Sequence, residues 1–368
     1  MYKARLQKMY NAMEAAGLDS IVVNPGSSFT YLTGLEFHTS ERPTVLFLTP
    51  GKQPVLVLPK LEILKLNFLK YDAQGIAYDE NPAVWQDSFN QAIAAQGSAG
   101  KKIGMEPSAL RMLEYGYIQA AAGNAQFVNA ADVFAHLRNT KDANEVALMR
   151  KAAQIAQDAL KATLPSVKIG ISEKQLANEL VIQLLRHGCG PTLPFSPIVG
   201  SGANSANPHA TPTDRLVQDG DLLLFDWGAS YEGYFSDLTR TYAIGNVAEK
   251  FRAIHKIVQD ANIAGRAAGA PGKPCAAVDQ AARGVIDAAG YGQYFRHRTG
   301  HGLGMEVHED PYMRGDNMQL LEVGMAYTVE PGVYLEGENG VRIEDDMVIT
   351  ESGSESLSDM DRTLQFLA

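Results

Sequence analysis

The chain has 368 residues, of which 45% are hydrophobic and 20% charged, and its net charge is −10. A length of about 100–200 residues per domain predicts two domains, and the composition is that of a soluble globular protein. The acidic balance argues against a nucleic-acid partner, because binding to phosphates needs clustered lysine and arginine.

No stretch of the sequence approaches the roughly 20 apolar residues that are needed to span a bilayer. The start of the chain, residues 5–16, predicts an amphipathic helix, and it lacks the apolar core and cleavage site of a signal peptide. We therefore expect no membrane partner and a cytoplasmic location.

The first part of the chain alternates helix and strand patterns. After the helix over residues 5–16, the pattern predicts a further helix over 61–69 and strands over 20–23, 45–48, 55–58 and 102–105. Such alternation is typical of an α/β layer domain. We expect this domain to span residues 1–138.

The second part of the chain begins after residues 139–141. Helical patterns cover 144–164 and 173–187, a loop rich in glycine and proline covers 188–212, and a hairpin follows over 222–242. Two more helices are expected over 249–268 and 276–290, and hairpins over 302–349. The order of helices, hairpin, helices and hairpin predicts an α+β domain over residues 139–368, with a rough internal duplication.

Two of these hairpins bring carboxylates together inside apolar strands. Folding the first about the turn at 231–234 sets Asp226 roughly opposite Asp237. Folding the last about 335–339 sets Glu330 near Glu344. Like charges opposite each other destabilise a sheet, and burying them costs several kcal/mol unless something compensates. A bound cation would compensate.

His301 is the fifth candidate ligand, because glycines on both sides of it allow a ligand or other backbone to approach closely. A lone histidine is otherwise more often a core residue than a ligand. Four carboxylates and one imidazole form an oxygen-rich set, and four negative charges suit two divalent ions better than one. We expect two such ions, Mn²⁺ first, with Co²⁺ or Zn²⁺ as alternatives.

Several motifs follow one another in an order that resembles the pita-bread metallopeptidases. They are DWGASYEGYFSD, HRTGHGLG, EVHE, VEPGVY and VRIEDD, and the first part adds YLTG. Together they resemble the Xaa-Pro peptidase branch, which comprises aminopeptidase P and prolidase (Xaa-Pro dipeptidase). The resemblance implies a creatinase-type α/β domain over residues 1–138 and a pita-bread α+β catalytic domain over 139–368.

The resemblance also implies how the metals are held. Asp226 would be a bidentate ligand of one metal, and Asp237 and Glu344 would bridge both metals. His301 and Glu330 would complete the second site.

Further residues match catalytic and substrate-binding positions of that branch. Glu330 would also shuttle a proton, and His209 and His308 would bind the substrate and stabilise the tetrahedral intermediate. His297 and Arg342 match positions on the far side of the substrate.

Position 298 bears on the length of the substrate. Arg298 stands where prolidases often have glycine, and this form, together with residues 41–43 and 59–62, looks more like the compact bacterial aminopeptidase P group. We therefore expect an Xaa-Pro aminopeptidase that acts on small peptides with proline at position two. The alternatives are a prolidase restricted to dipeptides and a non-catalytic peptide-binding relative.

Two other enzymes fit the sequence less well. A methionine aminopeptidase would usually lack the first domain, and creatinase lacks the metal ligands that are present here. The resemblance further suggests a homodimer, to which the polar loop 36–42 could contribute. Phe195, Pro197 and Tyr231 are candidate walls of an apolar proline pocket.

Overall fold

The computed structural model describes every residue from Met1 to Ala368, and the chain divides into two compact units, Met1–Arg138 and Asn139–Ala368. No helix in it is both long and apolar enough to cross a membrane.

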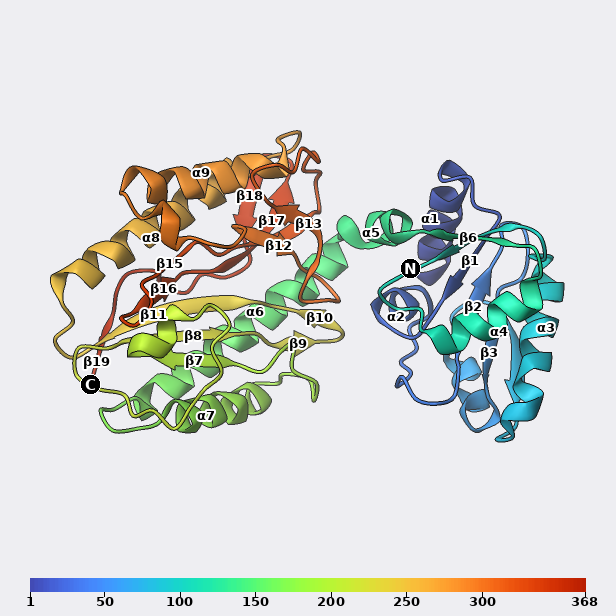
Figure 1. Cartoon of the computed structure of the whole chain (residues 1–368), viewed down its shortest axis with the longest axis horizontal. Coiled ribbons are helices and arrows are strands. Elements are labelled where there is room, and N and C mark those ends of the chain that lie inside the picture. Colours follow the sequence, from blue (N-terminus) through green and yellow to red (C-terminus); the bar gives the residue numbers. More distant parts are fainter. The chain divides into compact units, whose positions relative to one another are not determined.

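The first unit is an α/β layer structure, as predicted, and contains one six-stranded sheet in the order β4-β3-β2-β1-β5-β6 (Figure 1). The strands are β1 (Ser20–Val23), β2 (Val45–Leu48), β3 (Val55–Pro59), β4 (Gln74–Tyr78), β5 (Lys102–Met105) and β6 (Gln126–Asn129). The helices are α1 (Tyr2–Ala15), α2 (Ser27–Thr33), α3 (Trp85–Gln96), α4 (Met112–Ala122) and α5 (Ala131–Asn139).

The four strands predicted for this unit are confirmed, whereas other elements differ from the prediction. The helical pattern over residues 61–69 forms the 3₁₀ helix η1 (Lys60–Phe68), none of whose residues is buried. A short 3₁₀ helix, η2 (Pro82–Val84), precedes α3. Strand β4 escaped prediction because its burial pattern is mostly exposed, so it lacks the apolar run of a buried strand.

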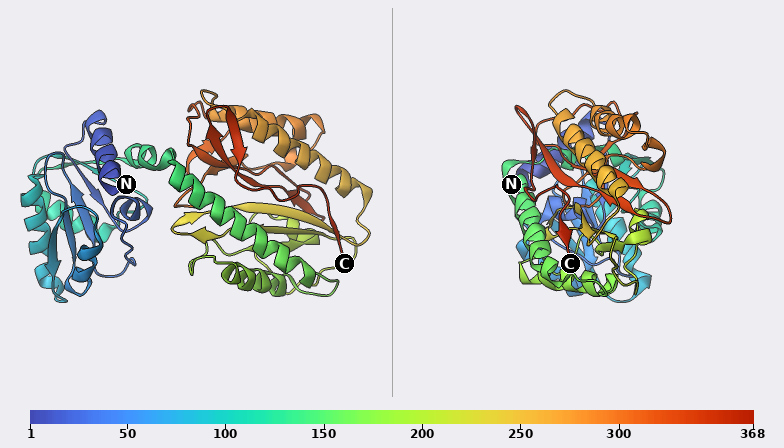
Figure 2. Two further views of the ribbon diagram at one scale, coloured as in Figure 1. Left: turned by 180° about the vertical axis from the view of Figure 1, so that it is seen from behind. Right: turned by 90° about the vertical axis from the view of Figure 1, so that its left-hand side faces the viewer.

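The second unit places its sheets between two helix pairs (Figures 1 and 2). One pair is α6 (Ala143–Thr163) with α7 (Glu173–Arg186), and the other is α8 (Glu249–Ala268) with α9 (Cys275–Ala288). Helix α6 begins with a capping box in which the Asp142 and Glu145 side chains bind each other's backbone N–H groups. The predicted α+β order of helices and hairpins is confirmed.

The strands of this unit form two main sheets and two short ribbons. One sheet has the order β19-β11-β8-β7 and the other β13-β12-β14-β17-β18, while β15 pairs with β16 and β9 with β10. Their bounds are β7 (Ile198–Ser201), β8 (Leu222–Trp227), β9 (Ser230–Tyr231), β10 (Tyr234–Phe235), β11 (Leu238–Ile244), β12 (Gly300–Gly302), β13 (Glu309–Met313), β14 (Ala326–Val329), β15 (Gly332–Tyr334), β16 (Gly340–Arg342), β17 (Asp345–Thr350), β18 (Gly353–Ser356) and β19 (Phe366–Leu367). Short 3₁₀ turns lie at η3 (Leu164–Ser166), η4 (Gly202–Ala206) and η5 (Gly292–Tyr294).

The loop expected over residues 188–212 contains two elements that the sequence did not predict. Strand β7 pairs antiparallel with β8, and η4 follows it directly. The glycines and prolines that flank these elements dominate the pattern. They conceal a strand of only four residues, three of which are buried.

The hairpin that carries Asp226 turns where predicted, but its register differs. Tyr231 pairs with Tyr234, and the two central residues, Glu232 and Gly233, both have positive φ, which is typical of a type I′ turn. Asp226 lies opposite Thr239 rather than Asp237. Because side chains two residues apart share a face, Asp237 still lies on the same side of the ribbon as Asp226.

The core of the second unit contains a buried histidine on α8, His255, and its burial lowers its pKa to about 4. Between about pH 6.5 and pH 4 the unfolded chain binds a proton at His255, whereas the folded chain does not. We therefore expect the free energy of unfolding to fall as the pH decreases through this range. The loss attributable to His255 is on the order of 3 kcal/mol. Thermal unfolding of His255→Leu across this range should show a shallower pH dependence than wild type.

A matched control for this experiment is His187→Asn, which changes an exposed histidine. Its unfolding temperature should follow pH as the wild type does. An unchanged slope in His255→Leu would contradict the prediction.

Candidate metal centre

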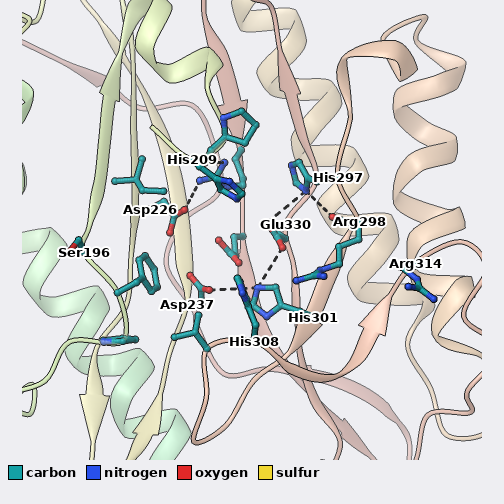
Figure 3. Close-up of a pocket in the computed structure, with 17 residues that line it drawn as sticks. Ser196, His209, Asp226, Asp237, His297, Arg298, His301, His308, Arg314 and Glu330 are labelled. Atoms are coloured by element: carbon teal, nitrogen blue, oxygen red, sulfur yellow. Dashed lines mark hydrogen bonds and ion pairs between the residues drawn. The ribbon is translucent and has the colours of Figure 1, made fainter. Parts of the chain in front are cut away.

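A cavity of about 740 Å³ opens in the second unit and collects most of the predicted site residues (Figure 3). The acids and histidines named from the sequence all contribute to its wall, and so does Arg342. The lining residues are Pro194, Phe195, Ser196, Ile198, Pro208, His209, Asp226, Asp237, His297, Arg298, His301, Val307, His308, Arg314, Glu330, Arg342 and Glu344.

The five predicted ligands form two overlapping groups of three. Ligand atoms of Asp226, Asp237 and Glu344 lie within 4.8 Å of one another, and so do those of His301, Glu330 and Glu344. Glu344 belongs to both groups. Such an arrangement has the donors for two neighbouring cations that share one carboxylate.

Thr239 connects the two hairpins that supply the carboxylates. It pairs with Asp226 across β8 and β11, and its carbonyl accepts a hydrogen bond of 3.1 Å from the backbone N–H of Glu344. Its hydroxyl donates to the Glu344 carboxylate at 2.6 Å. One threonine thus fixes the spacing between acids that are far apart in the sequence.

The second acid pair lies where one antiparallel ribbon changes into another. Val329, the last residue of β14, pairs with Asp345, the first of β17. Gly332, the first residue of β15, pairs with Arg342, the last of β16. Glu330 and Glu344 occupy the interval between these pairs, in the same register. Their backbones therefore leave the regular ladder, and the Glu330 N–H donates instead to the carbonyl of Thr299 at 2.7 Å.

Burial makes this cluster costly in the absence of a cation. Burial raises the pKa of Asp237 and of Glu344 well above the usual carboxyl range, and the neighbouring carboxylates raise them further. Burial also raises the pKa of Asp226, and it raises the pKa of Glu330 to about 7. A positive charge among these four carboxyl groups would therefore stabilise their ionised forms.

One oxygen of Asp226 is buried and has no hydrogen-bond partner. Its other oxygen, Oδ2, accepts from Arg342, so Oδ1 is the atom that Asp226 can offer to a ligand. A buried carboxylate oxygen without a donor is costly unless a cation or solvent satisfies it. This orphaned atom, at the edge of the acid cluster, fits a divalent cation.

The geometry of His301 also suits a metal ligand. Its Nδ1 lies 3.1 Å from the carbonyl of Gly302, which can only accept, so that nitrogen carries the proton. The lone pair of Nε2 then faces the carboxylates, 3.7 Å from Asp237 and 3.6 Å from Glu330. Burial lowers the pKa of His301 to about 3 and keeps the ring neutral, as metal binding requires.

The glycines beside His301 are needed because other backbone approaches them closely. A Cβ at Gly300 would lie 1.8 Å from the carbonyl oxygen of Thr328, and one at Gly302 would lie 2.2 Å from that of Asp310. The sequence predicted that a ligand or other backbone approaches these glycines closely, and here it is backbone that does so. These contacts fix β12 between β13 and β14.

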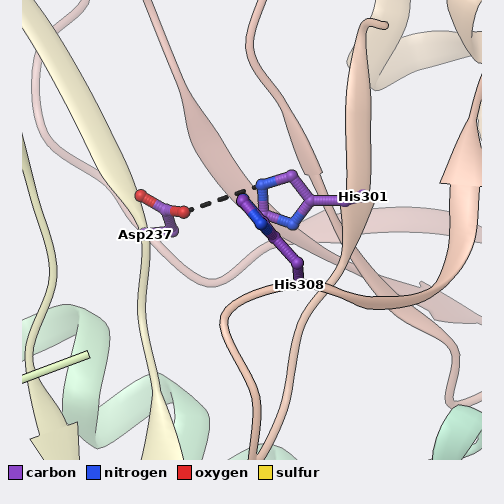
Figure 4. A group of neighbouring side chains, drawn as sticks. All are labelled: Asp237, His301 and His308. Carbon is purple, nitrogen blue, oxygen red and sulfur yellow. Dashed lines mark ion pairs between the residues drawn. The ribbon is translucent and has the colours of Figure 1, made fainter. Parts of the chain in front are cut away.

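His308 lies against the ligand cluster from a different direction (Figure 4). Its ring meets that of His301 edge-on, with 4.2 Å between centroids. Its ring also forms a group with Asp237 and His301 that could hold an ion, but the His308 side chain is exposed whereas those two are buried. This exposure makes the His308 ring better placed to contact a bound molecule than to ligate an ion.

His297 lines the cavity, but both of its ring nitrogens are already engaged. Nδ1 donates to the carbonyl of Arg298 at 2.7 Å, and Nε2 accepts from the hydroxyl of Tyr334 at 2.8 Å. That hydroxyl accepts in turn from Arg342 at 2.8 Å. The imidazole therefore orients the tyrosine and the arginine, and a polar contact with a substrate would first have to break one of these bonds.

His209 is exposed at the cavity wall, where its own backbone N–H donates to the side chain of Asn207 at 3.2 Å. Figure 3 shows it on the Asp226 side of the cavity, whereas His297, His301 and Glu330 lie on the other side. The two cavity histidines with exposed rings, His209 and His308, thus approach the acids from separate chain segments.

The apolar wall differs from the one expected. Phe195 lines the cavity, but Pro197 and Tyr231 do not, and Tyr231 packs against the hydrophobic core instead. Pro194, Ile198, Pro208 and Val307 complete the apolar lining. Period-two patterns could not reveal them, since they come from loops and from the unpredicted strand β7.

Two arginines of the cavity, Arg298 and Arg314, were not among the predicted catalytic, substrate-binding or metal-ligating residues, although Arg298 bears on the predicted length of the substrate. Arg298 forms no ion pair, and its guanidinium lies over the ring of Tyr312 at 4.4 Å. Arg314 pairs only with Asp316 beside it. The nearness of Arg298 to His301 in the sequence could have indicated the first, but nothing in the sequence around Arg314 could have indicated the second.

Two family models match the chain. Residues 147–351 match the model described as "Metallopeptidase family M24", and residues 5–140 match "Creatinase/Prolidase N-terminal domain".

Similar proteins cover almost the whole chain. An "Xaa-Pro dipeptidase" of Lactobacillus delbrueckii subsp. lactis is 33% identical, and the match covers 98% of each chain. A "Putative dipeptidase YkvY" of Bacillus subtilis is also 33% identical, over 99% of each chain. Among solved structures, the recombinant prolidase of Thermococcus sibiricus has a TM-score of 0.93 and 34% identity, and covers 100% of this chain and 99% of its own.

Proposed function

Since the chain belongs to metallopeptidase family M24, we propose that it is a dinuclear-metal Xaa-Pro dipeptidase. The Arg298 motif favoured an aminopeptidase, but the relatives described as dipeptidases and prolidases support the alternative better. The observation that carries the proposal is the pair of ligand groups that share Glu344 inside a cavity with apolar and cationic walls.

The ligand assignment follows the two groups. Asp226, Asp237 and Glu344 would hold one divalent cation, and His301, Glu330 and Glu344 would hold the other. Asp237, which lies 3.7 Å from Nε2 of His301, would be the second bridging carboxylate that the resemblance implies. Bound there, the cations supply Lewis acidity and lower the pKa of water in the site.

The side chains around the cations complete the chemistry. The Glu330 carboxylate takes up a proton from water and passes it towards the proline nitrogen that leaves. His209 and His308 donate hydrogen bonds to the substrate oxygen on which negative charge develops. Phe195 and Ile198 form an apolar wall for the proline ring, whose imide nitrogen has no N–H to satisfy.

The wider assignments rest on the family resemblance. Mn²⁺ is the proposed native ion, with Co²⁺ and Zn²⁺ as alternatives, and the proposed enzyme is a cytoplasmic homodimer. Light scattering on the purified protein decides the oligomeric state.

A panel of peptides tests the proposed substrate class. We expect kcat/KM for Xaa-Pro dipeptides to exceed that for matched Xaa-Pro-Xaa tripeptides by at least about tenfold, a difference of ~1.4 kcal/mol. Xaa-Ala dipeptides serve as controls for proline and should be cleaved poorly. Faster cleavage of tripeptides would support the aminopeptidase instead, to which the X-Pro aminopeptidase of Thermotoga maritima gives structural precedent at 26% identity and a TM-score of 0.85.

Arg298 and Arg314 give a reason for a preference for dipeptides. In an Xaa-Pro dipeptide the proline carries the free C-terminal carboxylate, which either arginine could bind. A charge-assisted hydrogen bond contributes about 1.5–3 kcal/mol. We therefore expect Arg314→Gln to raise KM for an Xaa-Pro dipeptide roughly 10–100-fold, with little change in kcat, in steady-state assays.

Two controls accompany this variant. The C-terminal amide of the same dipeptide has no carboxylate, so wild type and Arg314→Gln should cleave it equally. Arg296→Gln changes an exposed arginine outside the cavity lining and should leave KM unchanged. An equal loss on the amide would contradict carboxylate recognition by Arg314.

A further inference from the structure

A buried ion pair between Lys141 and Glu309 has no part in the mechanism described so far. The lysine Nζ lies 2.7 Å from the Glu309 carboxylate, and it also donates to the carbonyl of Asn139 at 3.3 Å. The two side chains are only 2% and 5% exposed. The lysine side chain is long and flexible, so its burial is tolerable only because Glu309 and the carbonyl of Asn139 bind its ammonium group.

The acid of this pair directly follows His308 in the chain. Glu309 is the first residue of β13 and pairs with Gly302, which itself directly follows His301. Neighbouring residues of a strand point to opposite faces. The exposed His308 ring faces the cavity, while the Glu309 carboxylate faces the buried lysine behind it.

The pair also lies against the loop that leads to His308. A Cβ at Gly304 would lie 2.6 Å from Oε1 of Glu309 and 3.0 Å from Cε of Lys141. Only a glycine fits there while the pair keeps its place. The backbone of this loop, residues 303–307, forms no regular secondary structure, so its path depends on such contacts.

The lysine is itself fixed by its backbone. The N–H of Lys141 donates to the carbonyl of Gly324 at 2.8 Å, and Thr140 forms a bridge with Met325 beside it. Met325 precedes β14, which leads to Glu330. The ion pair thus connects the segment that supports Glu330 with the segment that presents His308.

We propose that Lys141 and Glu309 are positioning residues for His308, and that their ion pair holds the loop 303–307 so that this imidazole stays against His301 at the reaction centre. The proposal rests on the proposed function in so far as it gives His308 a catalytic role. Neither residue lines the cavity, so neither touches the substrate, and both act through the position of the histidine.

A double-mutant cycle tests this proposal. The double substitution Lys141→Met with Glu309→Gln removes both charges together, so that no unpaired charge stays buried. In the His308 background we expect kcat for an Xaa-Pro dipeptide to fall by on the order of 10²-fold, as misplacement by about 1 Å can cause, with KM and metal content almost unchanged. In the His308→Ala background the same double substitution should change kcat less than about twofold.

Conservative variants guard against a general folding defect. Lys141→Arg keeps the positive charge and a donor for Glu309, so it should lose less turnover than the double variant. Asp221→Asn weakens another ion pair, with Arg215, at the end of β8 away from Asp226. It should lower the unfolding temperature and leave kcat unchanged.

A crystal structure of the metal-loaded double variant provides a readout that does not depend on activity. The His308 ring should be displaced from its 4.2 Å contact with His301. An undisplaced ring, or equal losses of kcat in both His308 backgrounds, would overturn the proposal. Failure of the wild type to cleave Xaa-Pro peptides would instead overturn the proposed function, and the displacement of the ring could still be judged.

Discussion

Glu344→Gln is expected to lower kcat on an Xaa-Pro dipeptide by roughly 10³-fold, because Glu344 is the carboxylate common to both ligand groups. Metal ions contribute several kcal/mol of transition-state stabilisation, and each 1.36 kcal/mol corresponds to tenfold in rate. The amide oxygen of glutamine can still accept from Thr239, so local packing should be kept. Elemental analysis of the purified variant should show fewer than two equivalents of metal.

The same substitution should have the opposite effect on the metal-free protein. Without cations, Glu344 lies among Glu330, Asp226 and Asp237 in a buried site, and removing one acid relieves their repulsion. The metal-free variant should therefore unfold at a temperature no lower than metal-free wild type, while the rise in that temperature on adding Mn²⁺ should be lost. Glu336→Gln, at the exposed tip of the same hairpin, is the matched control.

Two outcomes would contradict this assignment of Glu344. Full occupancy by two metals in the variant would remove it from the ligand set. Wild-type turnover with reduced metal content would show that one cation is enough.

Removal of the cations from the wild type is expected to abolish turnover, and adding Mn²⁺ or Co²⁺ should restore it. The site is rich in carboxylates and contains no thiol, which suits these ions and Zn²⁺. Titration of the chelated protein should need two equivalents per chain for full recovery. Recovery that is complete at one equivalent, or full activity of metal-free protein, would contradict the dinuclear site.

Cation binding should also depend on pH in a defined direction. Burial and neighbouring acids raise the pKa of the ligand carboxyl groups, that of Glu330 to about 7, so the free site retains protons that a cation must displace. The apparent affinity should therefore increase as the pH rises through neutrality. Isothermal titration in buffers of different ionisation enthalpy measures the released protons directly.

The acids of the site could be predicted because strand periodicity and turn chemistry are local properties. The type I′ turn at Glu232 and Gly233 fixes one hairpin, and a single register carries Glu330 opposite Glu344 in the other. A carboxylate within an apolar strand is costly to bury unless something compensates for its charge, and such a carboxylate can be recognised from the sequence alone.

Contacts between distant segments could not be predicted in this way. The bond from Thr239 to Glu344 and the ion pair of Lys141 with Glu309 each join residues more than 100 positions apart. The register of β8 with β11 also escaped prediction, because the strands are interrupted between Trp227 and Leu238 by a second, separate ribbon. Periodicity describes which face a residue occupies, whereas these features depend on which segments meet.

The bond between Thr239 and Glu344 has a consequence for the order of events during synthesis. The hairpin with Asp226 and Asp237 leaves the ribosome long before β16 and β17 exist, and a domain folds as a unit only when its parts are present. Until Glu344 arrives near the end of translation, a nascent chain lacks the carboxylate that the two overlapping groups share, so neither of these two groups can bind a cation during its early collapse. Metal loading of these two groups should therefore follow the synthesis of residue 344 rather than precede it.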